Sequence, residues 1–128
     1  SAALMDSNQA LSLDPNDSNR YFDRARVYIS LDDFTMALID LSQALKFQEN
    51  DITLLYWRCY VYKKQLDFQS ALKDANRVIA LARKTKVTNV DLLREIYKMR
   101  GQINQAIGRK ELARKDFEKA DMSEDTLS

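Results

Sequence analysis

The sequence lacks several residue types on which common protein chemistries depend. It contains no histidine and a single cysteine, Cys59. Without histidine, the usual general bases, catalytic triads and most zinc sites cannot be assembled. The paired acids Asp32-Asp33 and Glu124-Asp125 have no nucleophile motif or glycine-rich loop to work with. We therefore expect no enzyme, no metal site and no cofactor, and one cysteine excludes a disulfide within the chain.

Glycine and proline are also scarce. The 128 residues include two glycines and one proline. A β-sandwich or a doubly wound α/β fold needs many turns and would normally use more of both residues. Long helices need few of either, so the scarcity favours an all-helical chain.

Neither charge nor hydropathy favours a nucleic acid or a membrane. Lys and Arg number 20 against 19 Asp and Glu, which gives a net charge of +1. No apolar run approaches the roughly 20 residues needed to span a bilayer, and the first residues lack the features of a secretion signal. We expect a cytoplasmic, intracellular protein without a membrane partner. A local basic group remains at Lys63, Lys64, Arg83, Lys84 and Lys86, but the interspersed acids weigh against RNA binding.

One stretch of the chain returns at a fixed distance. Residues 31–41 reappear 34 positions later, at 65–75. The matched positions are Phe34 and Phe68, Ala37 and Ala71, Leu38 and Leu72, and Asp40 and Asp74. Self-similarity at such a period indicates a repeat architecture, in which each copy is one supersecondary unit.

The same frame extends in both directions. A further copy starts at Arg94, after eight additional residues, and places Tyr97, Gly101, Ala113 and Phe117 in register. Upstream, Ala3, Leu4, Ala10, Leu11 and Leu13 lie 34 residues before Ala37, Leu38, Ala44, Leu45 and Phe47. We predict one helical repeat domain over 1–128, with a half repeat at 1–17, repeats at 18–51, 52–85 and 94–122, and an extended junction at 83–93. We expect this domain to be a piece of a longer array.

Hydrophobic spacing within the copies is helical. Tyr21, Ala25, Tyr28 and Ile29 fall on one face, with small residues where paired helices would approach each other. The predicted helices are 2–13, 18–31, 34–48, 52–65, 68–85, 90–107 and 110–122. The eight additional residues should lengthen the fifth and sixth helices, with Thr88 or Asn89 capping the sixth.

This pattern resembles the tetratricopeptide repeat family. That family has a 34-residue helix–turn–helix unit with small residues at positions 8 and 20 and an aromatic residue near position 11. Leu13-Asp14-Pro15-Asn16 matches the typical repeat ending, whereas Asn104 departs from the aromatic position. The resemblance implies an all-α, right-handed α-solenoid of antiparallel helix pairs with about seven helices.

Two positions carry recurrent charges. Position 7 holds Arg24, Arg58 and Arg100, and position 23 holds Asp6, Asp40, Asp74 and Asp116. We expect an Arg–Asp pair that bridges two helices; the alternative is surface charge. Cys59 occupies a small packing position and should be a buried, inert thiol.

The resemblance also implies which side chains line the concave groove. In the family, positions 2, 5, 9, 12 and 13 of each first helix face this surface. The predicted site is an aromatic and basic strip of Phe22, Arg26, Tyr56, Tyr60, Lys63, Lys64 and Lys98. The alternative interpretation is packing aromatics beside a solvated lysine face. Family co-chaperones hold a C-terminal carboxylate with five clamp residues, and none of the five is present here. The corresponding positions hold Phe22, Arg26, Trp57, Glu95 and Met99.

The leading hypothesis is a protein–protein interaction scaffold. A peptide segment of a protein partner, of acidic character, would lie in the groove against the aromatic and basic strip. The alternative is self-assembly through uncapped terminal helices, in which Leu4, Leu11, Leu112 and Phe117 form a homodimer or a continued solenoid.

Overall fold

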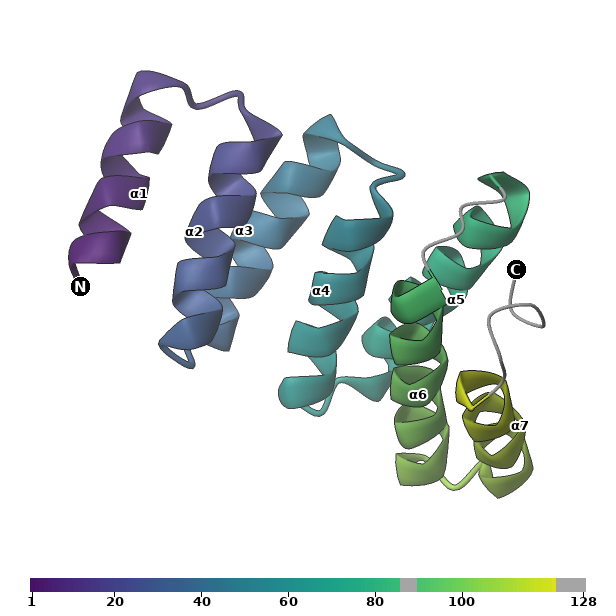
Figure 1. Cartoon of the computed structure of the whole chain (residues 1–128). Coiled ribbons are helices and arrows are strands. Elements are labelled where there is room, and N and C mark those ends of the chain that lie inside the picture. Colours follow the sequence, from purple (N-terminus) through teal and green to yellow (C-terminus); the bar gives the residue numbers. More distant parts are fainter. Residues whose placement is uncertain (86–89, 122–128) are drawn as a thin grey trace.

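The computed structural model describes residues 1–85 and 90–121, and these form seven helices joined by short turns (Figure 1). The helices are α1 (Ala2–Leu13), α2 (Ser18–Ser30), α3 (Phe34–Phe47), α4 (Ile52–Lys64), α5 (Phe68–Thr85), α6 (Val90–Ala106) and α7 (Lys110–Ala120). The part of the chain that the structure describes contains no strand. The all-α prediction is confirmed, and the predicted ends of the first six helices lie within one residue of the observed ends.

The additional residues lengthen two helices, as predicted. α5 has 18 residues against 14 in α3, and α6 has 17 against 13 in α4. α5 continues to Thr85 and α6 begins at Val90. The predicted caps Thr88 and Asn89, and the predicted end of α7 at residue 122, lie outside the described residues.

Aspartate residues precede three consecutive helices. Asp17, Asp33 and Asp51 cap α2, α3 and α4, each accepting a hydrogen bond from a backbone N–H of the first turn. Such a cap satisfies one of the donors that a helix N-terminus leaves without an intrahelical partner. These caps fix where each helix begins.

Neighbouring helices pack in antiparallel pairs, and the pairs stack. α2 packs on α3, α4 on α5 and α6 on α7, while α3–α4 and α5–α6 contacts join successive pairs. In Figure 1 the helices follow one another as a row, with α3 partly behind α2 and α5 partly behind α6. This is an α-solenoid, in which each unit contacts only its neighbours. No helix within residues 1–85 and 90–121 combines the length and the apolar character that a membrane span requires.

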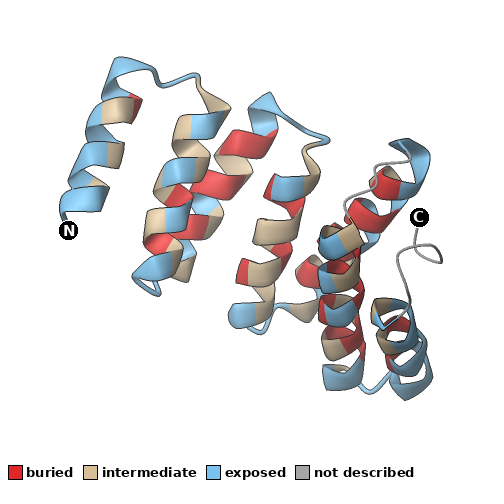
Figure 2. Ribbon diagram, in the orientation of Figure 1, coloured by how far each residue is buried: buried red, intermediate tan, exposed pale blue. Residues whose placement is uncertain are grey.

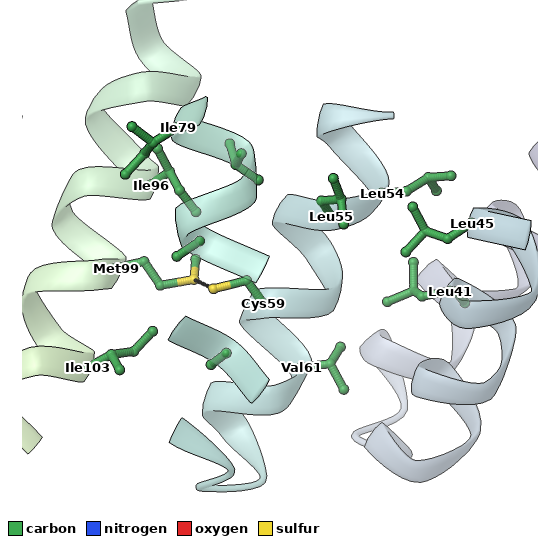
Figure 3. Packing of buried hydrophobic residues seen from close by; sticks show 14 of the residues in the cluster. Leu41, Leu45, Leu54, Leu55, Cys59, Val61, Ile79, Ile96, Met99 and Ile103 are labelled. Carbon is green, nitrogen blue, oxygen red and sulfur yellow. Dashed lines mark hydrogen bonds between the residues drawn. The ribbon is translucent and has the colours of Figure 1, made fainter. Parts of the chain in front are cut away.

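Small side chains allow the close packing of the paired helices. Ala25, Ala37 and Ala71 are fully buried, and the buried faces meet inside the row (Figure 2). Cys59 on α4 is also fully buried, with its Sγ 3.4 Å from Sδ of Met99 on α6 (Figure 3). This full burial confirms the prediction of a buried thiol, and it raises the pKa of the Cys59 thiol to about 12.

Gly101 shows how strict the small position is. A Cβ atom at this residue would lie 2.7 Å from Cε1 of Phe117 on α7. The Phe117 ring therefore occupies the space that a side chain would take. In the preceding repeat, Cys59 and Ala75 occupy the positions of Gly101 and Phe117. A larger residue on the first helix of the pair is matched there by a smaller one on the second.

The predicted Arg–Asp pairs are present in all three helix pairs. Arg24 pairs with Asp40, Arg58 with Asp74, and Arg100 with Asp116, at closest distances of 2.7, 2.8 and 2.7 Å. Each guanidinium uses two nitrogens on its carboxylate. The carboxylates are almost completely buried, whereas the arginines are 22–23% exposed.

The same arginines also reach the preceding pair of helices. Nη1 donates to Asn8 for Arg24, to Ser42 for Arg58 and to Asn76 for Arg100. Each arginine therefore joins three helices. Asp6 occupies the same repeat position as the paired aspartates, but it is exposed and makes no ion pair with a described residue.

Candidate functional site

The predicted site residues lie on three helices: α2, α4 and α6. On α2, the guanidinium of Arg26 lies 5.7 Å from the centre of the Phe22 ring. Phe22 is half-buried and packs against the core, while Arg26 is exposed. The pair forms a compact cation–π unit that can contact a ligand on one side.

The α4 aromatics form a continuous cluster. Trp57 makes edge-to-face contacts with Tyr56 and Tyr60, with ring centres 5.4 and 5.5 Å apart. Lys64 places its Nζ 5.5 Å from the centre of the Tyr60 ring. All three rings are half-buried against the core. They therefore serve packing, as the alternative interpretation held, and still leave aromatic surface accessible.

The lysines of α4 and α6 lie near one another. Lys63 donates a hydrogen bond to Oε1 of Gln102 on α6, at 2.5 Å. Burial, followed by the charges of Lys64 and Lys98, lowers the pKa of Lys63, while the Cys59 thiol opposes this shift. Lys63, Lys64 and Lys98, here called the lysine cluster, make no ion pair with any residue that the structure describes.

One carboxylate lies at the edge of the lysine cluster. Burial and then the charge of Glu95 raise the pKa of the Tyr56 hydroxyl. Glu95 and Lys98 also line a cavity of about 360 Å³ between α6 and α7. The surface is therefore basic at Lys63, Lys64 and Lys98 and acidic beside Tyr56.

The structure brings five of the seven predicted residues together. Tyr56, Tyr60, Lys63 and Lys64 share α4, and Lys98 joins them from α6. Phe22 and Arg26 form a separate pair on α2, and among the described residues no hydrogen bond, ion pair or ring contact connects them to the α4 side chains.

Three residues outside the predicted site contact or adjoin the aromatic and lysine side chains of α4. Trp57 packs between the two tyrosines, Gln102 holds Lys63, and Glu95 faces Tyr56. Glu95 and Gln102 stand at groove-facing repeat positions, which was the signal available in the sequence. Trp57 carried no such signal. In residues 1–85 and 90–121, no three side chains of Cys, Asp or Glu gather in a way that could hold a metal ion.

The terminal helices carry exposed apolar residues, but mostly other ones than the self-assembly alternative named: on α1, Met5 is 72% exposed and Leu13 is 76% exposed. Leu11 is 6% exposed and Leu112 is 47% exposed, while Leu4 and Phe117 are half-buried. Arg114 of α7 pairs with Glu111 and Glu118 on the exposed side of the helix. The expectation that Leu11 is available for an interface is wrong, because α1 packs that side chain inward.

Comparisons with known proteins place the chain in a family. A sequence model of the tetratricopeptide repeat matches residues 18–51 and 95–124. None of the curated proteins compared with the chain matches it. Two crystal structures of MamA superpose with a TM-score of 0.79 at 17% identity, covering 91% of this chain and 64% and 60% of theirs.

The chain therefore spans less than two thirds of the MamA chains that it resembles. The N-terminal domain of stress-induced protein-1 (STI-1) from C. elegans superposes with a TM-score of 0.73 at 17% identity, covering 80% of each chain. These structural similarities support the helical-repeat fold. The match to the tetratricopeptide repeat model covers half of the residues of the chain. The chain belongs to the tetratricopeptide repeat family.

Proposed function

We propose that this protein is an interaction scaffold that binds an acidic peptide segment of a protein partner against α4 and α6. The observation that carries the proposal is the lysine cluster: three ammonium groups that form no ion pair with a carboxylate of residues 1–85 and 90–121, beside the half-buried rings of Tyr56 and Tyr60. Tetratricopeptide repeats typically act as non-catalytic protein-interaction modules, which agrees with this function.

The two components of the surface contribute differently to binding. Tyrosine rings offer a large contact area at a low cost in side-chain entropy. Lysines attract and orient carboxylates, although salt screens such exposed charges. Burial and then the positive charges of Lys64 and Lys98 lower the pKa of Lys63, so an incoming carboxylate would offset repulsion among the lysines as well as forming its own ion pair.

Phe22 and Arg26 provide a second contact for the same segment. They lie on α2, at the repeat positions that Tyr56 and Tyr60 occupy on α4. In Figure 1, α2, α4 and α6 follow one another along the row. A segment that binds α4 and α6 and continues toward α2 would reach an aromatic ring and a cation there. The positive charges of Arg26 and of the lysine cluster are the reason for proposing an acidic segment.

The test is selection of peptides from a random display library, followed by affinity measurements with variants. We expect enrichment of sequences that contain several acidic residues. Tyr56→Ala/Tyr60→Ala and Lys63→Ala/Lys98→Ala should each weaken binding of a selected peptide by about tenfold or more, with the helical circular dichroism retained. The matched control is Lys46→Ala/Lys73→Ala, because both lysines are exposed on α3 and α5. Equal affinity of the groove variants and the control would contradict the proposal.

Self-assembly has a distinct signature. Light scattering at several concentrations should give the mass of a single chain if the scaffold acts as a monomer. A molar mass that rises with concentration, and falls again in Leu112→Lys, would instead favour assembly through the end of α7, where Leu112 is exposed.

A further inference from the structure

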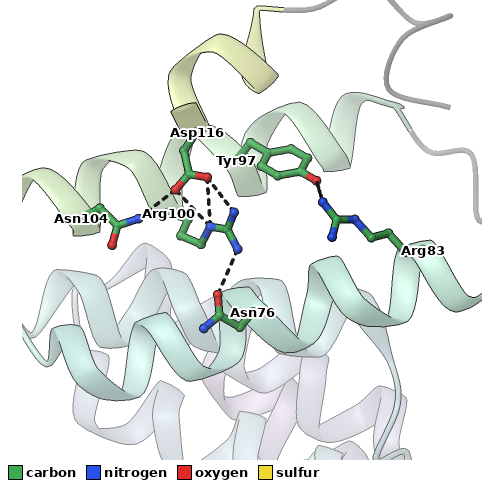
Figure 4. Close-up of polar contacts among 6 residues, drawn as sticks. All are labelled: Asn76, Arg83, Tyr97, Arg100, Asn104 and Asp116. Atoms are coloured by element: carbon green, nitrogen blue, oxygen red, sulfur yellow. Dashed lines mark hydrogen bonds and ion pairs between the residues drawn. The ribbon is translucent and has the colours of Figure 1, made fainter. Parts of the chain in front are cut away.

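A second charged surface lies on the opposite side of α6 from the lysine cluster. It is a cavity of about 320 Å³ between α5, α6 and α7. Its charged lining consists of Arg83, Arg100, Arg109, Lys115, Lys119 and Asp116. Tyr97 and Asn104 lie in its wall (Figure 4). At about 100° per residue, Tyr97, Arg100 and Asn104 share one face of α6, and Glu95, Lys98 and Gln102 share the other.

The cavity carries a large excess of positive charge. Five cations face one carboxylate, for a formal charge of +4, and Asp116 is already bound by Arg100. Tyr97 gathers the cations: Arg83 donates to its hydroxyl at 3.1 Å, and Arg100 and Lys119 lie 5.5 and 5.9 Å from its ring centre. Nothing in the described lining neutralises Arg83, Arg109, Lys115 and Lys119.

The equivalent place in the preceding repeat is electrically balanced. Moving back by one repeat, the six charged positions between α3, α4 and α5 hold Glu49, Arg58, Asp67, Lys73, Asp74 and Arg77. Three cations and three carboxylates give a formal charge of zero. The repeat fold therefore does not require the excess of positive charge at the cavity, because the same helix packing forms one repeat earlier without it.

Two residues that line the cavity, Arg109 and Asn104, differ in kind from the residues at the same positions of the earlier repeats. Asp33 and Asp67 precede α3 and α5 and accept hydrogen bonds from the first-turn N–H groups of Met36 and Ser70. Arg109 holds the same position before α7 and makes no side-chain cap. A cation thus replaces a stabilising cap at the rim of the cavity. Such departures are expected at functional sites.

Asn104 is the second departure. The aromatic position holds Tyr28 and Tyr62 in the earlier repeats. Asn104 is 3% exposed; its Nδ2 donates to Asp116 at 2.9 Å, and its Oδ1 has no hydrogen-bond partner in the structure. Asparagine is smaller than the tyrosine of the earlier repeats, and here it lines the cavity and holds the Asp116 carboxylate.

We propose that this cavity binds a phosphate monoester. The volume is near the lower limit for ligand sites, about 300 Å³, so it holds one compact group rather than several acidic side chains. A phosphate monoester brings a charge of about −1.5 to −2 and three acceptor oxygens at pH 7, whereas a carboxylate brings one charge. Arginine forks and lysines suit those oxygens.

The proposal can be tested by nuclear magnetic resonance on the full chain. The probes are O-phosphoserine, an acetylated Gly-phosphoserine-Gly tripeptide, its Gly-Glu-Gly counterpart, inorganic sulfate and a single-stranded RNA oligonucleotide. We expect saturable shifts of backbone amides in residues 97–119 with both phosphoserine probes. Equal affinities for these two would identify a small phosphate ester as the ligand, and tighter binding of the tripeptide would identify a phosphorylated partner.

The pH dependence gives a further criterion. The groups that face the ligand are arginines, lysines, Asp116 and Tyr97, and the chain has no histidine. Titration between pH 5.5 and 7.5 therefore belongs to the phosphate, whose second pKa is about 6. Binding of O-phosphoserine should tighten about fourfold across this range, and sulfate binding should stay constant.

Paired variants separate a built site from general surface charge. Lys115→Ala/Lys119→Ala should weaken O-phosphoserine binding by about tenfold, whereas Lys73→Ala/Arg77→Ala, the same positions one repeat earlier, should leave it unchanged. Arg109→Asp should raise the melting temperature by restoring the cap and yet weaken binding. Asn104→Tyr, which keeps every charge, should abolish it by filling the cavity.

Four results would overturn the proposal. They are equal weakening by the two double variants, retained affinity in Asn104→Tyr, binding of sulfate or of the Gly-Glu-Gly peptide as tight as that of the phosphoserine probes, and tighter binding of RNA. The peptide selections of the proposed groove do not involve these variants, so failure of one proposal leaves the other intact.

Discussion

At the scale of single residues, the turns within the helix pairs show one strained position. Asp32, Leu66 and Gly108 occupy the same place in three successive turns, with φ of 58°, 62° and 85°. Aspartate tolerates this left-handed region and glycine adopts it freely, but leucine has a Cβ clash there. Leu66 is 71% exposed, so packing does not compensate for the strain.

Replacing this leucine should therefore stabilise the protein. Left-handed backbone costs a residue with a side chain roughly 1–2 kcal/mol, and the entropy of an unfolded glycine offsets about half of this. We expect Leu66→Gly to raise the free energy of unfolding by about 0.5–1 kcal/mol, measured by urea denaturation. The reverse change, Gly108→Leu, should lower it. A destabilised Leu66→Gly would show that the side chain makes a contribution that its exposure conceals.

Cys59 couples stability to alkaline pH. Burial raises the pKa of its thiol from 9.0 to about 12. Between these values the unfolded chain ionises its thiol and the folded chain does not, so the folded state binds more protons and stability falls as pH rises. The contribution is at most about 1.4 kcal/mol per pH unit, and it is fully present below pH 9.

Comparison with an alanine variant isolates this contribution. In Cys59→Ala, which carries the side chain of Ala25 at the same repeat position, the decrease in stability between pH 9 and 11 should be smaller than in the wild type. Lys63 acts in the opposite direction, because its lowered pKa makes the folded state bind fewer protons as pH approaches 10.5. Parallel stability curves for the two proteins would contradict the burial of the thiol.

At the scale of the helices, each arginine of an Arg–Asp pair joins the two helices of its own pair and also bonds to the preceding helix. Asp74 is almost completely buried and receives two hydrogen bonds from Arg58. Removing its charge leaves the guanidinium without its partner, but Arg58 is 23% exposed and retains access to water. The penalty is therefore smaller than the roughly 3–5 kcal/mol of a fully buried ion pair.

A matched pair of substitutions tests this role. We expect Asp74→Asn to lower the free energy of unfolding by about 2 kcal/mol. Asp6→Asn, the same substitution at the same repeat position, should change it by less than about 0.5 kcal/mol, because Asp6 is exposed and makes no ion pair with a described residue. Guanidinium chloride denaturation measures both. Similar effects at the two sites would show that the ion pair is not what makes Asp74 important.

The repeat period explains how much of these elements the sequence predicts. A fixed spacing of Phe34 and Phe68, and of Ala37 and Ala71, determines helix type, helix ends and the pairing of arginine with aspartate, because every copy repeats the same local contacts. Contacts between copies are not determined in this way. The approach of Lys98 on α6 to Lys63 on α4 depends on how successive pairs stack.

The candidate sites are harder to predict than the fold for the same reason. The repeat positions predict Tyr56 and Tyr60 as groove residues, but they do not predict that Phe22 and Arg26 form a separate pair. The basic cavity is the extreme case. Asn104 stood out in the sequence as a departure from the aromatic position, yet its meaning depends on Arg83, Arg109 and Lys119 from neighbouring elements.

At the scale of the whole molecule, the solenoid offers two surfaces with different chemistry. One side of α6 contributes to the aromatic and lysine surface, and the other contributes to the cavity with a formal charge of +4. The overall net charge of +1 conceals both. The two surfaces share a helix but no side chain, so the peptide and the compact anion that we propose as ligands would not compete for the same residues.

The central claim is that an acidic segment binds over the lysine cluster, and differential acylation of lysines tests it most directly. The chain is acylated with and without a peptide selected from the library, and each lysine is quantified by mass spectrometry. We predict protection of Lys63, Lys64 and Lys98, with Lys46 and Lys73 unchanged as controls on α3 and α5. Protection of Lys46 and Lys73, with Lys63, Lys64 and Lys98 fully reactive in the complex, would contradict it.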